Sequence, residues 1–276
     1  MSKIALISDI HGNLTALEAV LADAKAEQAT HYFILGDLII PGPGCRSILN
    51  LLKALPNIII VRGNWDDFLF WVKSATLEIP TNVYGCRLAK YVEERLRAAE
   101  LKFVQELPLL QVAEINGLKF LICHHLPHKN HGGDLWPIEV QENFDGLFLD
   151  YEVDVAIYGH MHLQLLRYST AGQMILNPGS VGMPVFTWEA HARDLRAQYG
   201  IIDVDDVGIQ SINFKKVTYD VEKEVEYARK NELPYVDLYA NTLKTGIAPT
   251  HNKELLAKVN AKFGYKEEVI AFLAQS

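Results

Sequence analysis

The chain has 276 residues, of which 49% are apolar and 22% are charged, and its formal net charge is -8. This composition is that of a globular protein with a sizeable core, and it excludes a largely disordered chain. Duplex nucleic acid is disfavoured as a partner, because neutralisation of phosphates by Lys and Arg supplies most of that affinity and the sequence has no long basic run.

Cysteine usage and the N-terminal residues bear on the cellular compartment. Cys45, Cys86 and Cys123 are widely spaced and form no CxxC pair, which fits a reducing compartment better than a disulfide framework. The first apolar run stops at Asp9 and is too short for a signal-peptide core or a membrane span. We therefore predict a cytoplasmic protein that does not associate with a membrane.

Strands and helices alternate in the first part of the chain. Residues 3–8 form an apolar run typical of a buried strand, and from Asn13 the apolar residues follow helical spacing. Further strands are predicted at 32–35, 57–61, 118–123 and 154–158, with helical patterns near 46–55, 66–78 and 84–105. This alternation predicts an α/β fold whose first sheet is largely parallel.

After Tyr158 the pattern changes to short strands separated by turn residues. These runs cover 163–169, 173–176, 198–205 and 208–215. Because little helix lies between them, they predict a second, more antiparallel sheet. Two sheets packed face to face with helices outside make a four-layer α/β/β/α sandwich, to which we assign residues 1–218.

From Tyr219 the sequence returns to helical patterns. They are EKEVEYARK, VDLYANTLKTG and NKELLAKVNAKFG, two of which end at Gly. We assign residues 219–276 to a C-terminal helical extension packed on the same domain. Three roles stay open for it: covering a sheet edge, forming a lid, or mediating self-association into a homo-oligomer.

A side chain able to bind a metal follows each strand of the first set. His160 and His162 stand two residues apart, so in extended backbone their side chains would point to the same side. Ligands of open α/β sheets bind beyond the carboxyl ends of the strands, so the whole set is expected to converge at one rim. Singly, each has an ordinary explanation, such as a helix cap for Asp9 or a turn for Asn64. The set is Asp9, His11, Asp37, Asn64, His124, His160 and His162.

The chemistry of these ligands narrows the choice of metal. Carboxylate, imidazole and amide groups without thiolate suit Mn, Fe, Zn or Co. The set is too large for one tetrahedral ion but suits two ions that share a carboxylate. Such a pair clamps phosphate oxygens and lowers the pKa of a bridging water. We therefore expect two divalent or trivalent ions, Mn and/or Fe first with Zn, Co and Ni as alternatives, and a small anionic phosphate ester as substrate.

The motifs SDIHGN, GDL, RGN, CHH and GHMH, followed by NPGS, resemble in their order the calcineurin-like metallophosphoesterase family over roughly residues 1–215. Within it the chain is similar to the small bacterial phosphodiesterases, which implies the same α/β/β/α sandwich. The resemblance also implies the bridging carboxylate, Asp37, which we place with Asn64 in the catalytic set. One ion would be held by Asp9, His11, Asp37 and His162, and the other by Asp37, Asn64, His124 and His160.

The sequence departs from this family at Trp65. Many relatives have there, directly after the GN pair, a histidine that protonates the leaving oxygen. Acid catalysis typically contributes about 10²–10⁴-fold, so its loss slows the enzyme, restricts it to good leaving groups, or is made up elsewhere. The segment HHLPHKNHGG supplies His125, His128 and His131. We name His125 and His131 as candidates for the acid, with a solvated polar loop as the alternative.

Substrate contacts are predicted around the same rim, each beside a structural alternative. Trp65 could stack a base, or pack a helix into the core. Asn13 could orient His11 near the substrate or cap a helix. Arg62 could contact a phosphate oxygen or be a satisfied residue at a strand end. Asn177 and Ser180 could bind phosphate, position His162, or form an ordinary turn.

These features support a phosphoesterase that acts on a phosphodiester or phosphoanhydride of a nucleotide. The segment GDLIIPGPG resembles the diadenosine tetraphosphate hydrolases, so a dinucleoside polyphosphate is one candidate substrate. The alternative is an inactive scaffold with the same fold, as the retromer scaffold subunit of this family illustrates. A protein phosphatase is disfavoured, because the acid histidine is replaced by Trp65.

Overall fold

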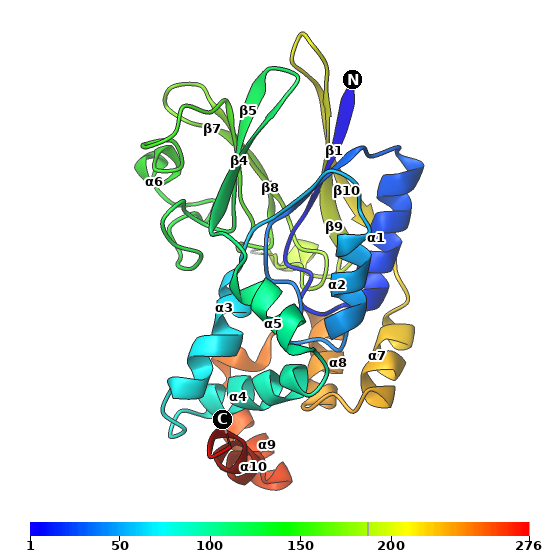
Figure 1. Ribbon diagram of the computed structural model, residues 1–276, viewed down its shortest axis with the longest axis vertical. Helices are drawn as coiled ribbons and strands as arrows, with labels where there is room; N and C mark the ends of the chain where they lie inside the picture. Colours follow the sequence, from blue (N-terminus) through cyan, green and yellow to red (C-terminus); the bar gives the residue numbers. More distant parts are fainter. Residues whose placement is uncertain (187, 276) are drawn as a thin grey trace.

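Two five-stranded sheets lie face to face in the computed structural model, which describes residues 1–186 and 188–275 (Figure 1). Sheet A has the strand order β10-β9-β1-β2-β3, and sheet B has the order β4-β5-β6-β8-β7. Sheet A consists of β1 (Ser2–Ile7), β2 (His31–Ile34), β3 (Ile58–Ile60), β9 (Ala197–Val204) and β10 (Ile209–Val217). Sheet B consists of β4 (Leu110–Ile115), β5 (Leu118–Cys123), β6 (Val155–Ile157), β7 (Gln164–Tyr168) and β8 (Met174–Pro178).

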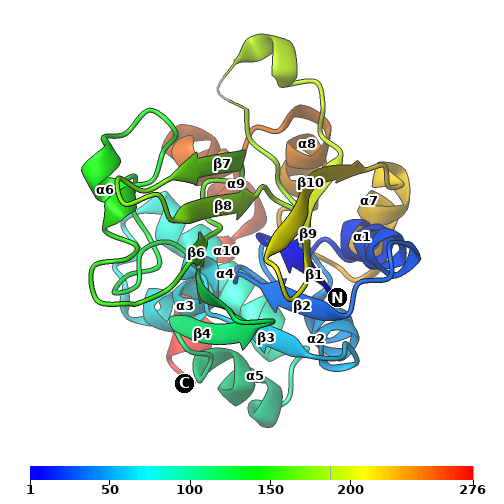
Figure 2. The same ribbon diagram turned by 90° about the horizontal axis from the view of Figure 1, so that it is seen from above.

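Helices form the outer layers, so the predicted four-layer α/β/β/α sandwich is confirmed. Figure 2 shows α1 and α2 on the outside of sheet A and α6 on the outside of sheet B. The helices of residues 1–218 are α1 (Leu14–Ala26), α2 (Cys45–Lys53), α3 (Asn64–Trp71), α4 (Pro80–Glu93), α5 (Ala98–Gln105) and α6 (Gln141–Asp145). Two short 3-10 segments, η1 (Val72–Ser74) and η2 (Glu189–His191), belong to the same part of the chain.

Alternation along the strands builds the apolar layers. In β1, Ile4 and Leu6 face sheet B, whereas Ala5 and Ile7 face the helices. Both faces of β1 are therefore buried, which is why the strand reads as a continuous apolar run. The layer between the sheets also contains Phe33 and Phe120, whose rings meet edge to face at 5.9 Å.

The division of strands between the sheets differs from the prediction. Both sheets are mixed: β1 to β3 are parallel while β9 and β10 join sheet A antiparallel, and β4 and β7 pair antiparallel at the edges of sheet B. The predicted parallel set is thus divided, since β5 and β6 belong to sheet B. Hydrophobic periodicity predicts a strand but not its partner, and this explains the error.

Three other elements differ from the prediction. The helical pattern at 84–105 is two helices, because Arg97 is extended and its backbone N–H donates to the Glu100 carboxylate at 2.7 Å, which starts α5. Strand β4 was missed, although Asn116 and Gly117 form the turn to β5 with positive φ, the usual signal of a tight hairpin. A fourth C-terminal helix, α10 (Tyr265–Leu273), was missed as well.

The C-terminal helices pack beneath sheet A and its helices (Figure 1). They are α7 (Val221–Lys230), α8 (Val236–Thr245) and α9 (Lys253–Phe263), with α10 and the 3-10 segment η3 (Pro249–His251). Helix α7 contacts α1, while α9 and α10 contact α4. Leu256 and Val269 lie in the same apolar cluster as the residues of α4. The domain boundary at 218/219 stays a prediction.

Glu224 connects α7 to the start of α1. It is fully buried, and its carboxylate accepts hydrogen bonds from Thr15 N (2.9 Å), Thr15 Oγ1 (2.6 Å) and Tyr239 OH (3.1 Å). Burial raises the pKa of this carboxyl. Because Thr15 lies in the first turn of α1, the extension helps to fix the helix that follows the His11 loop.

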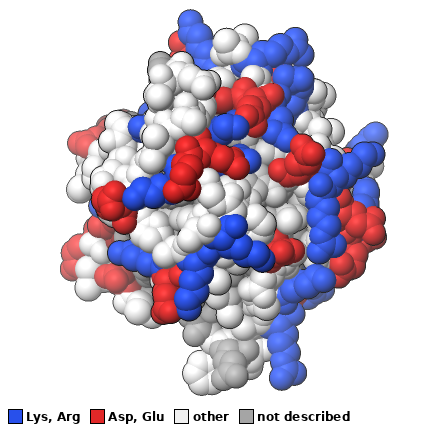
Figure 3. All heavy atoms as spheres, turned by 90° about the horizontal axis from the view of Figure 1, so that it is seen from below, with Lys and Arg blue, Asp and Glu red and all other residues white. Residues whose placement is uncertain are grey.

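Surface charge and thiols agree with the composition. Over the face drawn in Figure 3, Lys and Arg side chains are interspersed with Asp and Glu. Cys45, Cys86 and Cys123 are buried free thiols. Within the residues that the structure describes, no helix is both long and apolar enough to cross a membrane. The cytoplasmic location and the oligomeric state stay predictions.

We expect Glu224→Ala to lower the free energy of unfolding by about 2–3 kcal/mol, because it leaves buried donors of Thr15 and Tyr239 unpaired. Glu222→Ala on the same helix is the control, since Glu222 is exposed and forms a surface ion pair with Lys244; its effect should stay within about 0.5 kcal/mol. Urea denaturation measures both. Equal stabilities of the two variants would contradict the role given to Glu224.

Candidate metal centre

The loops that follow β1, β2, β3, β5 and β6 bring all seven predicted ligands to one rim. Each of two groups offers ligand atoms that lie within 4.8 Å of one another, and both groups include Asp37. Asn64 joins the second group, because its Oδ1 lies 3.0 Å from His124 Nε2. The first group is Asp9, His11, Asp37 and His162, and the second is Asp37, His124 and His160.

Lone pairs face each other in the first group. His11 Nδ1 donates to the carbonyl of Ile40 at 2.7 Å, and His162 Nδ1 donates to the carbonyl of Met183. The two Nε2 atoms, which therefore carry lone pairs, lie only 3.1 Å apart. Asp9 Oδ1 is 3.1 Å from His162 Nε2 and, like Asp37 Oδ2, is buried without a hydrogen-bond partner. Such a set requires a positive charge at its centre, either a proton or a metal ion.

The second group repeats this arrangement around His124. Its Nδ1 donates to the carbonyl of Leu35 at 2.5 Å, which directs Nε2 to Asn64 and to Asp37 Oδ2 at 3.4 Å. His160 Nε2 faces the carbonyl of Gly132 at 3.1 Å, so Nδ1 is left for the site. Asp37 Oδ2 also lies 3.6 Å from His11 Nε2. One carboxylate oxygen thus lies between both groups, and the residues fit a pair of ions.

The carboxylates and imidazoles strongly shift one another's protonation. Burial disfavours the charged form of Asp9, but His162, His124 and His11 together hold the pKa of its carboxyl below the usual range. Burial likewise opposes charge on His124, yet Asp37 and Asp9 raise its pKa to about 10. Burial and the neighbouring His124 lower the pKa of His160 to about 3. The field at the rim is therefore that of a cation site.

The backbone is left-handed at five of the seven ligands. The φ angles are 53° at Asp9, 51° at His11, 54° at Asp37, 64° at His160 and 56° at His162. This corrects the extended backbone assumed for His160 and His162: β6 ends at Ile157, and both lie in the loop beyond it. Side chains other than Gly in this conformation cost about 1–2 kcal/mol each, so the surroundings must hold these loops in place.

Asp66 holds two of the loops together. Its buried carboxylate accepts hydrogen bonds from the backbone N–H groups of Asp37, Leu38 and Gly63, each at 2.9 Å. Gly63 leaves no room for a side chain, since a Cβ there would lie 2.1 Å from Asp37 Oδ1. The sequence analysis missed Asp66. Gly63 is the N-cap of α3 and Asp66 is the third residue of that helix. An acidic residue at this position is a capping signal, and it would have indicated Asp66.

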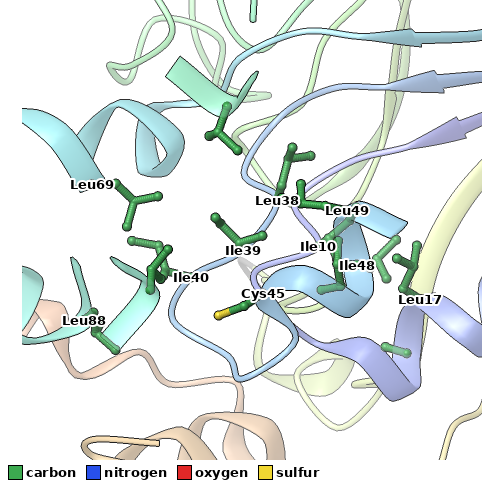
Figure 4. Packing of buried hydrophobic residues seen from close by; sticks show 14 of the residues in the cluster. Ile10, Leu17, Leu38, Ile39, Ile40, Cys45, Ile48, Leu49, Leu69 and Leu88 are labelled. Carbon is green, nitrogen blue, oxygen red and sulfur yellow. The ribbon is translucent and has the colours of Figure 1, made fainter. Parts of the chain in front are cut away.

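Apolar residues beside the ligands anchor the same loops in the core. Figure 4 shows Ile10, Leu38, Ile39 and Ile40 among the buried side chains of neighbouring helices, which include Ile48 of α2 and Leu88 of α4. Ile10 lies between two candidate ligands in sequence, and Leu38 to Ile40 directly follow Asp37. Burying these side chains fixes the loops so that the intervening polar groups point to the rim.

Four predicted substrate contacts have partners inside the protein. Asn13 caps α1 by accepting from Ala16 N, and it donates to Tyr219 OH at 3.1 Å. Arg62 forms an ion pair with Asp67 at 2.8 Å and donates to the carbonyl of Gln105. Both match the structural alternatives that the sequence left open. Their substrate-binding roles stay predictions.

Asn177 and Ser180 connect ligand loops to one another. Asn177 Nδ2 donates to the carbonyl of Gly159 at 2.7 Å, directly before His160. Ser180 Oγ donates to the carbonyl of Asp9 at 2.8 Å and accepts from Met183 N at 2.8 Å. Because the Met183 carbonyl accepts a hydrogen bond from His162 Nδ1, Ser180 positions two ligands at once.

The two acid candidates occupy different environments. His125 is buried, donates from Nε2 to Asp134 at 3.1 Å, and has its pKa lowered to about 4, mainly by burial. It is therefore neutral at neutral pH. His131 is exposed and lines a cavity together with Asn64 and Trp65. Neither role as the acid is tested by this geometry, and both stay predictions.

Two cavities adjoin the rim. The first, of about 460 Å³, is lined by His11, His160 and His162 and by residues of the C-terminal segment 242–251. The second, of about 500 Å³, is lined by Asn64, Phe68 and Trp71. Trp65 and Thr250 line both. The contribution of segment 242–251 was not predicted in detail, although a lid was one of the roles left open.

The sequence of residues 2–206 matches the calcineurin-like phosphoesterase superfamily domain. The chain is 32% identical to an uncharacterized protein of Methanocaldococcus jannaschii over 84% of its own length and 94% of that protein. It is 28% identical to phosphodiesterase YfcE of Escherichia coli, covering 80% of this chain and 98% of the relative. A shorter match, at 33% identity, covers 40% of this chain and 38% of the symmetrical bis(5'-nucleosyl)-tetraphosphatase of Klebsiella pneumoniae.

A solved metallophosphoesterase of Sphaerobacter thermophilus has a similar fold, with a TM-score of 0.66 at 25% identity, over 89% of this chain and 100% of that one. Fold, site and sequence match together define the class: the chain belongs to the calcineurin-like phosphoesterase superfamily. It is a metal-dependent phosphoesterase, a hydrolase, with a candidate metal-binding cluster at the rim. The predicted family resemblance is confirmed.

We expect metal binding to strengthen as pH rises, because imidazole nitrogens must lose protons before they bind an ion. The pKa of His124 is raised to about 10 in the folded protein, so the bound proton stabilises the metal-free fold. This stability is fully present below the pKa of His124 in the unfolded chain, and it is lost as pH rises through the pKa in the folded protein. The increase in melting temperature caused by Mn²⁺ should therefore be larger at about pH 8 than at about pH 6. Differential scanning fluorimetry measures it.

Asp37→Ala is the control for this experiment, since Asp37 belongs to both groups of ligand atoms. It should remove the Mn²⁺-dependent increase at either pH. An increase that does not change with pH, or one that persists in the variant, would contradict a metal centre built on these residues.

Proposed function

We propose that this chain hydrolyses a phosphodiester at a pair of metal ions held by the rim. Asp9, His11, Asp37 and His162 would hold one ion. Asp37, Asn64, His124 and His160 would hold the other. The observation that carries the proposal is the shared Asp37 Oδ2, which is buried, has no hydrogen-bond partner, and lies between the two groups.

Two such ions, when bound, polarise the phosphate and lower the pKa of a water molecule. Mn and Fe are our first candidates, because the donor set is oxygen and nitrogen without thiolate. The protein's own residues supply rigidity. Asp66 and Ser180 hold the ligand loops by hydrogen bonds to backbone groups, so the ligands need no rearrangement during turnover.

The similarity to phosphodiesterase YfcE, which extends over 80% of this chain, supports a diester substrate. The match to the tetraphosphatase covers only 40% of the chain, so it supports a dinucleoside polyphosphate less strongly. We therefore propose a phosphodiester as the main substrate class and keep diadenosine tetraphosphate as the second candidate. The substrate is a small molecule, which fits the size of the two cavities.

We expect Mn²⁺-dependent hydrolysis of bis(4-nitrophenyl) phosphate, and the release of 4-nitrophenolate measures its rate. His160→Ala should reduce kcat/KM by about 10³-fold or more, since it removes a group on which the reaction depends. His31→Ala is the matched control, because His31 begins β2 at the end of the strand away from Asp37. Its kcat/KM should stay within about twofold.

A folded protein that hydrolyses neither this diester nor diadenosine tetraphosphate with any divalent ion would contradict the proposal. It would favour the inactive scaffold. Product analysis of the second substrate would identify which anhydride bond is cut, should it be hydrolysed.

A further inference from the structure

The first cavity is bounded mainly by apolar side chains. Among the described residues that line it, none is Lys, Arg, Asp or Glu. Its polar groups are the candidate ligands at one end and a few hydroxyl and imidazole groups elsewhere. The apolar wall consists of Trp65, Trp136, Met183, Val185, Leu195 and Leu243. A wall of this kind binds an uncharged group by removing apolar surface from water.

The second cavity has an aromatic wall beside polar residues such as Asn130 and His131. Phe68 and Trp71 line it, and their rings meet edge to face at 4.8 Å. The charged residue in its lining is Asp67, which already forms an ion pair with Arg62. Asn64 places the second group of ligand atoms at this cavity. The rim thus opens onto two hollows, each of which offers an apolar or aromatic wall to an uncharged group.

Leu195 also lines a neighbouring hollow, whose basic side chains are Arg193, Arg196 and Lys216. Two of these cations bind Asp194, Arg196 by two hydrogen bonds at 2.7 and 2.8 Å and Lys216 at 2.8 Å. Arg193 is exposed and does not line the first cavity. A polyphosphate chain needs cations to neutralise each added phosphate. Because the described lining of the first cavity itself includes no Lys or Arg, it disfavours further phosphates beyond the one at the rim.

The wall contributed by segment 242–251 is fixed in place. Thr242 Oγ1 donates to the carbonyl of Ile247 at 3.1 Å, and Thr81 Oγ1 donates to the carbonyl of Thr250 at 3.5 Å. A Cβ at Gly246 would lie 3.0 Å from Leu195 Cδ2, so this loop packs closely on the opposite wall. The cavity is therefore formed before a substrate enters it.

We propose that the substrate is a phosphodiester with two uncharged aromatic or apolar ester groups, one in each of the two cavities that Trp65 lines. This inference rests on the proposed phosphodiesterase function. Water attacks phosphorus, the P–O bond to one ester group breaks, and the products are a phosphomonoester and a phenol or alcohol. The leaving oxygen takes up one proton of the water, and the oxygen of the water stays bound to phosphorus.

The test uses substrates that share a leaving group. For the Mn²⁺-loaded protein, kcat/KM for 4-nitrophenyl phenyl phosphate should exceed that for 4-nitrophenyl methyl phosphate by about tenfold or more, because the phenyl ring buries apolar surface. Diadenosine tetraphosphate should be a poorer substrate than either. Equal values for phenyl and methyl, or a preference for the tetraphosphate, would overturn the inference.

Binding provides a readout that does not depend on turnover. Diphenylphosphinate and dimethylphosphinate have P–C bonds and are not hydrolysed, and calorimetry gives their affinities for the Mn²⁺-loaded protein. The diphenyl compound should bind about tenfold more tightly or better. If no ester is hydrolysed, the proposed function fails, while this affinity ratio still decides whether the cavities prefer apolar groups.

Variants locate the preference within the site. Ile247→Glu at the first cavity and Trp71→Glu at the second should each reduce the phenyl-to-methyl ratio several-fold; both side chains are more than half exposed, which favours normal folding. Val207→Glu, in the turn between β9 and β10, is the matched control, since Val207 is exposed and lines neither cavity. An unchanged ratio in both cavity variants would contradict the proposal.

Discussion

The centre of this structure is a set of buried lone pairs that point at one another. Asp9 Oδ1 and Asp37 Oδ2 have no hydrogen-bond partner, and the Nε2 atoms of His11 and His162 lie 3.1 Å apart. Without positive charge this arrangement is repulsive, because each atom is an acceptor. The fold must therefore hold the acceptors together and rely on a cation to complete them, which is how a metal site differs from an ordinary polar core.

The cost of that arrangement is distributed over the surrounding fold. Five candidate ligands have left-handed backbone, a conformation that side chains other than Gly adopt with strain. Asp66 ties the Asp37 loop to Gly63, and Ser180 ties the loop of Asp9 to that of Met183. The side chains of Leu38 and Ile40 are buried in the apolar cluster on the helical side of sheet A, which holds the same segment in place. Site and core are thus one mechanical unit, so a change in the scaffold reaches the ligands.

Much of the site was predictable, because polar residues at the ends of apolar runs must meet at the carboxyl edge of a sheet. The pairing of the strands was not predictable, because periodicity is a local property whereas pairing joins distant segments. Strand β9 lies beside β1 in sheet A although more than 190 residues separate Ile4 from its partner Ile202. A local capping signal marks Asp66, but its contacts to Asp37 and Leu38 across the loop could not be predicted from that signal. The C-terminal wall was hidden for this reason too.

Trp65 links the chemistry of the site to the shape of its cavities. It lies where many relatives are expected to carry the acid histidine, and its ring meets His11 edge to face at 5.9 Å while it lines both hollows. Without an acid there, a leaving oxygen must depart with little protonation, which favours a leaving group of low pKa. A phenol, with a pKa of about 10, leaves far more readily than an aliphatic alcohol. Trp65 cannot donate a proton as a histidine would, but it supplies an aromatic surface. That surface suits aromatic leaving groups, which need protonation least.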